Sequence, residues 1–144
     1  MNAKQYLKQI TRLDNLIKSK LEQIEELRSL AEKVTVEAKL VKSYNKNSYQ
    51  SDKVGDIVVK IVDLNNEINE YIDRLIDLKA EAVRLIDSLE DPDYRLLLNL
   101  RYINGYTFER IAVEMNYCYR WITQLHGRAL EAFNGVLQEL IEAK

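Results

Sequence analysis

Acidic residues crowd the middle of the chain, and two of them have a spacing that suits metal binding. Glu67 and Glu70 form an E-x-x-E pair, and two carboxylates one helical turn apart are able to hold Mg²⁺. Glu22 and Glu25 form a second, looser pair with the same spacing. The hydrophobic pattern places Glu67 and Glu70 on the solvated faces of a helix, and no E-x-x-D pair follows on another helix. We therefore expect no metal site, no cofactor and no enzyme activity.

Cys118 and His126 are each the only residue of their type. Metal ligation normally needs several His, Cys or carboxylate ligands together, and the sequence around His126 offers no such cluster. Cys118 has no His or acid in a nucleophile pattern, although a helix N-terminus is able to activate a thiol for redox sensing. We expect Cys118 to be a tolerated residue at a helix cap. A single cysteine excludes an intrachain disulfide, which fits a reducing cytoplasm.

Residues 91–130 carry the start and stop signals of three short helices, the last two arranged as a helix-turn-helix. Asp91 suits the cap of the first helix, and Gly105 ends it because glycine tolerates a positive φ. Thr107 suits the cap of the second helix. Asn116 supplies the turn before the third, since asparagine enters the left-handed region readily.

Apolar residues recur at helical spacing within each of these three helices. They predict one inner face per helix, and the three faces together predict a small core. The expected inner residues are Leu96, Leu97, Leu100 and Ile103, then Phe108, Ile111, Ala112 and Met115, then Ile122, Leu125, Ala129 and Leu130.

The run LRYINGYTFERIAVEMNY, followed by ITQLHGRAL, resembles region 4 of sigma-70-type transcription factors. That region has an L-R-x-x-x-G start, an E-x-I-A first helix and a recognition helix that ends in K/R-A-L. The resemblance covers roughly the last third of the chain. The layout of long helices before this unit also resembles small phage and prophage regulators of the ArpU and RinA type. The matching residues are Leu100, Arg101, Gly105, Glu109, Ile111, Ala112, Ile122, Gln124, Leu125, Arg128, Ala129 and Leu130.

Three positions depart from the pattern of region 4. Asn116 stands where the family usually has glycine, which is a conservative change. Cys118 replaces the usual Ser or Thr at the recognition-helix cap and weakens that helix end by up to about 1 kcal/mol. Arg110 replaces an acid that often follows Glu109, so Thr107 loses a capping-box partner.

The resemblance implies that the third helix enters the major groove and reads base edges with its first turns. In that reading Arg120 suits a guanine edge, Gln124 an adenine and Thr123 a thymine methyl group. The positions that the resemblance assigns to base reading are Tyr119, Arg120, Thr123 and Gln124. Contacts with phosphates position such a domain without carrying sequence information, and here they are assigned to Arg110, Arg128 and His126.

Two long helices are predicted before residue 91. Residues 3–43 carry an apolar stripe with steps of three and four, and residues 54–90 carry six heptads without a break. A helix of about 40 residues must bury its stripe on something, so we expect residues 1–90 to form an antiparallel hairpin. Pairing in parallel between two chains is the alternative. The heptad residues are Val54, Ile61, Ile68, Leu75, Ala82 and Leu89, with Ile57, Leu64, Tyr71, Leu78 and Leu85 three later.

Further apolar residues widen the stripe of the second long helix beyond a two-helix seam. A wider stripe indicates more than one packing partner, and we expect a homodimer through the long helices. Asn65, Asn66 and Asn69 lie close to this stripe, where a buried Asn would set register. The additional apolar residues are Val58, Val62, Ile72, Ile76, Val83 and Ile86.

The composition fits an all-α protein. The chain has 144 residues, with one Pro and four Gly, 47% hydrophobic residues and 31% charged residues. No apolar run approaches the ~20 residues that span a membrane, and the N-terminus has no signal-peptide core. We therefore expect a cytoplasmic protein without a membrane partner. The net charge of −2 means that any DNA contact depends on local positive charge.

These observations together predict a two-part protein. Residues 1–90 would form the helical hairpin, and residues 91–144 a sigma-region-4-like helix-turn-helix that binds double-stranded DNA. The resemblance implies a phage or prophage transcription regulator that recognises promoter or operator DNA and contacts RNA polymerase. Because no stretch resembles the sigma segment that melts promoters, an activator is favoured over a sigma factor. Two alternatives stay open, a small-terminase-like DNA packaging protein and a protein-only coiled-coil adaptor.

Overall fold

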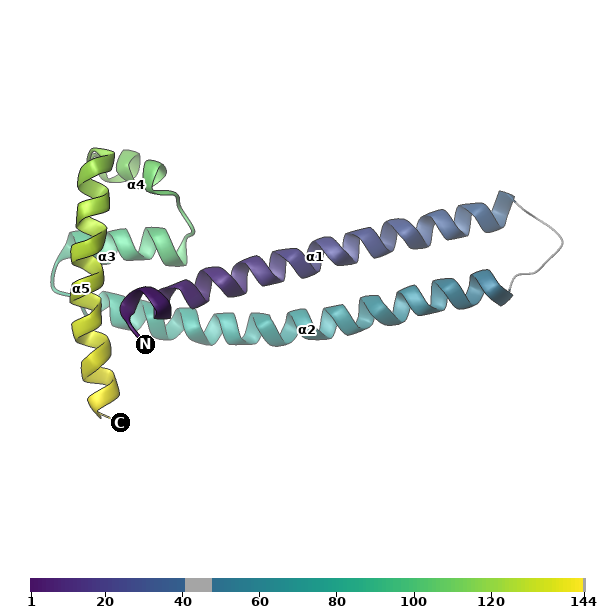
Figure 1. The fold of residues 1–144 in the computed structure, drawn as a ribbon, viewed down its shortest axis with the longest axis horizontal. Coiled ribbons are helices and arrows are strands. Elements are labelled where there is room, and N and C mark those ends of the chain that lie inside the picture. Colours follow the sequence, from purple (N-terminus) through teal and green to yellow (C-terminus); the bar gives the residue numbers. More distant parts are fainter. Residues whose placement is uncertain (41–47, 144) are drawn as a thin grey trace. The chain divides into compact units, whose positions relative to one another are not determined.

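The computed structural model describes residues 1–40 and 48–143 and shows an all-α protein (Figure 1). The predicted fold class is confirmed, since every element in the described part of the chain is helical. The second long helix begins earlier than the predicted residue 54, and the predicted helix end at residue 43 lies outside the described residues. The elements are α1 (Ala3–Leu40), α2 (Ser48–Asp87), α3 (Pro92–Leu98), the π-helix η1 (Asn99–Ile103), α4 (Phe108–Met115) and α5 (Tyr119–Ala143).

The chain divides into two compact units whose borders fall inside α1 and α2. The middle unit is Asn15–Asp73, and the terminal unit combines Met1–Asp14 with Arg74–Lys144. This division differs from a division at residue 90, because the start of α1 and the end of α2 belong with the short helices.

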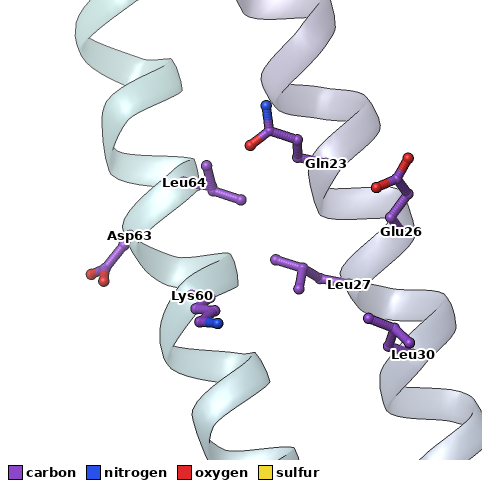
Figure 2. A pocket seen from close by; sticks show the side chains of 7 residues that line it. All are labelled: Gln23, Glu26, Leu27, Leu30, Lys60, Asp63 and Leu64. Atoms are coloured by element: carbon purple, nitrogen blue, oxygen red, sulfur yellow. The ribbon is translucent and has the colours of Figure 1, made fainter.

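In the middle unit α1 and α2 run antiparallel, as predicted for the hairpin. Lys20 of α1 pairs with Glu67 of α2 at 3.2 Å, and farther along α1 Leu27 lies near Leu64, which comes earlier in α2 (Figure 2). Residue numbers therefore rise along α1 in the direction in which they fall along α2, which is the antiparallel order. The seam is the predicted one, since Ile68 of the heptad is buried and its neighbours in the pattern within this unit, Ile61, Leu64 and Tyr71, are half-buried.

The packing between the two helices of the middle unit is incomplete. A hollow of about 410 Å³ lies between them, with leucines from both helices facing it (Figure 2). Among the described residues of this unit, only three apolar side chains are buried. A hairpin with so small a core gains little from burial, which normally supplies most of the stability of a helix in a protein. The buried residues are Ile17, Ile24 and Ile68.

The terminal unit has a larger core that is built from all of its helices. Its short helices follow the predicted pattern with one correction. Leu96, an expected inner residue, is 46% exposed, whereas Leu98 and Tyr102 are buried. The chain passes from α3 into the π-helix, where Asn104 N–H donates to the Asn99 carbonyl at 2.9 Å. At α-helical spacing Leu97 and Leu98 lie on one side of α3 and Leu96 lies on the other, so the inner face includes residue 98 in place of residue 96.

The first turns of α1 close this core against the C-terminal half of α5. The Tyr6 and Phe133 rings lie 5.7 Å apart, and the Tyr6 hydroxyl donates to Glu81 Oε1 at 2.5 Å. The Ala3 N–H donates to Asn134 Oδ1 at 2.6 Å. Residues at opposite ends of the chain therefore stabilise the same unit. None of the described helices has the length and apolar character needed to cross a membrane.

Replacing Tyr6 with alanine should destabilise the terminal unit, although Tyr6 precedes the short helices by more than 80 positions. The side chain is buried against Phe133, and truncation of a buried aromatic residue costs about 3–5 kcal/mol. Trp121, the only tryptophan, lies in α5, so urea unfolding followed by its fluorescence reports on this unit. Leu21→Ala is the control, because Leu21 lies half-exposed on the same helix in the middle unit. Equal midpoints for Tyr6→Ala and the wild-type chain would show that the terminal unit does not need α1.

Candidate nucleic-acid interface

The helix α4 begins and ends as its sequence predicts. Thr107 adopts extended backbone angles, and its hydroxyl oxygen accepts a hydrogen bond from the Arg110 N–H at 3.2 Å. Asn116 ends the helix in the left-handed region with φ 59° and ψ 40°. Both predicted caps are confirmed. Asn116 takes this conformation at little cost because its short polar side chain tolerates a positive φ.

The connections on either side of α4 are held by specific contacts. Before α4, Gly105 has a φ of 75°, and the Arg101 guanidinium donates to the Tyr106 carbonyl at 3.0 Å. After α4, the Tyr117 hydroxyl donates to Asp93 Oδ2 at 2.7 Å, which links the turn to the start of α3. The relative position of α4 and α5 is therefore fixed by side chains as well as by the core.

The helix α5 separates a buried face from an exposed face along its whole length. Ile122, Leu125, Ala129, Phe133 and Leu137 are buried. Of the expected inner residues, Leu130 is only half-buried. On the other side, the residues exposed over the first four turns are Tyr119, Arg120, Thr123, Gln124, Gly127, Arg128 and Glu131.

All four residues assigned to base reading lie on this exposed face, within the first two turns of α5. The Thr123 hydroxyl donates to the Arg120 carbonyl at 2.8 Å, so its methyl group is the part left for an outside contact. Within the described residues, the side chains of Arg120 and Gln124 make no hydrogen bond or ion pair. Tyr119 is 50% exposed. The structure thus brings these four side chains together, free to meet a partner.

Two of the three residues assigned to phosphate contacts are exposed and lie over aromatic rings. The Arg110 guanidinium is 3.6 Å from the centre of the Tyr106 ring, and that of Arg128 is 5.1 Å from Trp121. Such stacking orients a guanidinium without using up its hydrogen-bond donors. The Trp121 ring itself meets the Tyr117 ring edge to face, with the ring centroids 6.5 Å apart.

His126, the third residue assigned to phosphates, lies in a different environment. Its Nε2 shares a hydrogen bond of 2.8 Å with the Tyr102 hydroxyl, and its ring meets Phe108 edge to face at 4.9 Å. Burial, followed by the charges of Arg101 and Lys4, lowers the pKa of His126 to about 4. The ring is therefore neutral near pH 7 and connects η1, α4 and α5, so a phosphate contact from Nε2 would require the bond to Tyr102 to break.

Sequence reasoning assigned no role to two residues of this region. Arg101 lies over the Phe108 ring at 4.1 Å as well as bonding the Tyr106 carbonyl, so it braces the turn before α4. Gly127 lies on the exposed face of α5, and a Cβ atom placed there would meet nothing within 4 Å. The only sequence signal for Gly127 is a glycine inside a helical pattern, which is normally unfavourable.

The residues from the end of α1 to the middle of α5 match a known family. Residues 36–132 match the family described as a protein of unknown function (DUF1492). The chain belongs to the DUF1492 family. The matched segment takes in all of α2, α3, η1 and α4 and the exposed face of α5 just described. No curated protein and no solved structure shows a significant similarity to the chain.

One of the two acidic residues of the E-x-x-E pair in the middle unit forms an ion pair. Glu67 is half-exposed and pairs with Lys20, while Glu70 is exposed. Among the described residues, no group of three or more His, Cys, Asp or Glu side chains is placed to hold a metal ion.

The free energy of unfolding should fall as the pH drops from about 6.5 to about 4, with a contribution from His126. In this window the unfolded chain binds a proton at His126, whereas the folded chain does not. The loss should reach roughly 2 kcal/mol, after a discount for the partial exposure of the ring. Above pH 6.5 this group has no effect. Urea unfolding across this range should show the loss in the wild-type chain and a smaller one in His126→Gln. The same pH slope in both would contradict the assignment.

Changing Cys118 to serine should stabilise the start of α5. Cys118 directly precedes the helix, and its carbonyl accepts the Ile122 N–H at 3.1 Å, which is the geometry of an N-cap residue. A serine hydroxyl satisfies a free N–H of the first turn better than a thiol does, with a gain of up to about 1 kcal/mol. Thermal unfolding measures the change, and a clear fall in stability would show that the thiol has a packing role.

Proposed function

We propose that the chain is a DNA-binding transcription regulator that reads promoter or operator DNA with the first two turns of α5. The observation that carries the proposal is the exposed face of α5, where Tyr119, Arg120, Thr123 and Gln124 lie together. These side chains project from the start of the second helix of a helix-turn-helix, which is the part of such a motif that enters the major groove.

The chemistry of this face supports contact with base edges. Arg120 offers two parallel donors, which fit the O6 and N7 acceptors of guanine, and the Gln124 amide fits adenine. The Thr123 hydroxyl is held by its own helix, which leaves its methyl group for a thymine methyl. From Tyr119 to Leu130 the helix has no acidic residue, so nothing on these turns repels a phosphate backbone.

The similarity to sigma region 4 supports the finer parts of the proposal. By that similarity, the protein would be a regulator of the phage or prophage type, and its terminal unit would also contact RNA polymerase. Arg110 and Arg128 would bind phosphates on either side of the groove. Their guanidinium groups are already oriented by Tyr106 and Trp121, so less conformational entropy is lost on binding.

The proposal is tested by selection of bound duplexes from a random DNA pool with the full chain at two salt concentrations. An enriched sequence, with an affinity that falls as salt rises, is the expected result. An absence of enrichment together with an absence of retained DNA would overturn the proposal and favour a protein-only adaptor. The mass of the bound complex separates a regulator with few subunits from a packaging protein, which assembles into a ring.

Single substitutions on α5 should separate base reading from phosphate contact. Arg120→Ala and Gln124→Ala should each reduce discrimination at one base pair by about 1–3 kcal/mol, whereas Arg128→Ala should weaken binding to all sequences and lower the salt slope by about 1. Competition binding on the selected site and its single-base variants measures both effects. Arg28→Ala, at an exposed arginine of the middle unit, is the matched control. Equal losses on every sequence for Arg120→Ala and Gln124→Ala would contradict direct reading by these residues.

A further inference from the structure

Gly127 is a glycine in the interior of α5 that the fold itself does not require. Glycine in the middle of a helix is less stable than alanine there, because it loses more conformational freedom on folding. Among the described residues, Gly105 is the glycine with a positive φ, so Gly127 is not needed for its backbone angles. A Cβ atom at residue 127 would meet no atom of the described chain within 4 Å, so packing within the chain does not require glycine either.

The position of Gly127 on α5 directs it towards an outside partner. Gly127 is exposed, and it follows Thr123 by four residues and Gln124 by three, so it lies one turn beyond both on the same face. Arg120, seven residues earlier, lies within about 20° of Gly127 around the helix axis. The bare helix backbone at Gly127 therefore continues the surface that carries the proposed reading residues.

Openness alone does not mark a contact, since Gly135 of the same helix is also exposed and equally open. Gly135 lies eight residues farther along, which is about 12 Å by the helical rise. Glu131 lies between the two glycines on the exposed side of the helix, and its negative charge would repel a phosphate backbone. Gly127 thus belongs to the acid-free part of α5 that suits DNA, and Gly135 does not.

We propose that Gly127 is the point of closest approach between α5 and DNA, where the bare helix backbone lies against the sugar–phosphate backbone at the rim of the major groove. This inference rests on the proposed function and adds to it the residue that sets how deeply the helix enters. The major groove is about 12 Å wide and a helix with its side chains is about 10–12 Å across, so the fit is tight. A position without a side chain lets the helix come closer, which is a common use of glycine beside a ligand.

Replacing Gly127 with alanine should stabilise the chain and weaken its binding to DNA. The midpoint of thermal unfolding should rise by about 4 °C, because alanine is the better helix former and its Cβ has room in the described chain. The affinity for a duplex selected from the random pool should fall about 10-fold, because a methyl group would enter a packed contact. The loss should be equal on single-base variants of that duplex, since the sugar–phosphate backbone carries no sequence information.

Gly135→Ala is the matched control, because Gly135 lies in the same helix and is exposed and open in the same way. It should raise the unfolding midpoint by a similar amount and leave the affinity for DNA unchanged. A purely structural role for Gly127 would instead lower stability and affinity together in Gly127→Ala. That result, or equal affinities of the two variants, would overturn the inference.

The wild-type chain separates this inference from the proposed function. A wild-type chain that retains a selected duplex, together with an unchanged affinity in Gly127→Ala, would overturn the role of Gly127 and leave the proposed function standing. A wild-type chain that retains no duplex would overturn the proposed function, and the role of Gly127 with it.

Discussion

Burial of one face of α5 is the interaction on which the terminal unit depends. Ile122 and Leu125 fill the core beside the short helices, and Phe133, farther along the same helix, packs with Tyr6 of α1. A helix held at both ends of its buried face has little freedom to rotate. Its opposite face, with Arg120 and Gln124, is therefore presented in one orientation. A rigid element of this kind suits the base reading proposed for these side chains.

The environment of His126 shows how a polar group serves this arrangement. Its neutral ring shares a hydrogen bond with Tyr102 and meets the Phe108 ring, and the Arg101 guanidinium lies over that same Phe108 ring. A protonated ring would face the charge of Arg101 in a site that is partly removed from water. The site thus favours the neutral form, and the junction of η1, α4 and α5 is held by a group whose hydrogen bond is satisfied.

Local signals explain why much of the fold was predictable. The caps at Asp91, Thr107 and Asn116 depend on one or two neighbouring residues, and the long helices follow from a repeated apolar pattern. The sequence could not reveal the burial of Leu98 in place of Leu96, because both are leucines and only tertiary packing selects the side of α3 that turns inward. Nor could it reveal contacts such as Tyr6 with Phe133, which join distant positions. The residues expected to read bases could be placed on one face by periodicity, but the partner of His126 depends on tertiary packing.

The low charge of the chain bears on how the proposed DNA contact would gain affinity. The chain has a net charge of −2 and two stacked arginines, Arg110 and Arg128, beside the proposed reading face. One terminal unit would therefore offer few phosphate contacts, which supply much of the affinity of DNA-binding proteins. The homodimer expected from the sequence would carry two copies of α5. Once one copy is bound, the second meets DNA at a high effective concentration, so that affinity rises without additional charge. Two-fold symmetry in the protein would then be matched by inverted half-sites in the DNA.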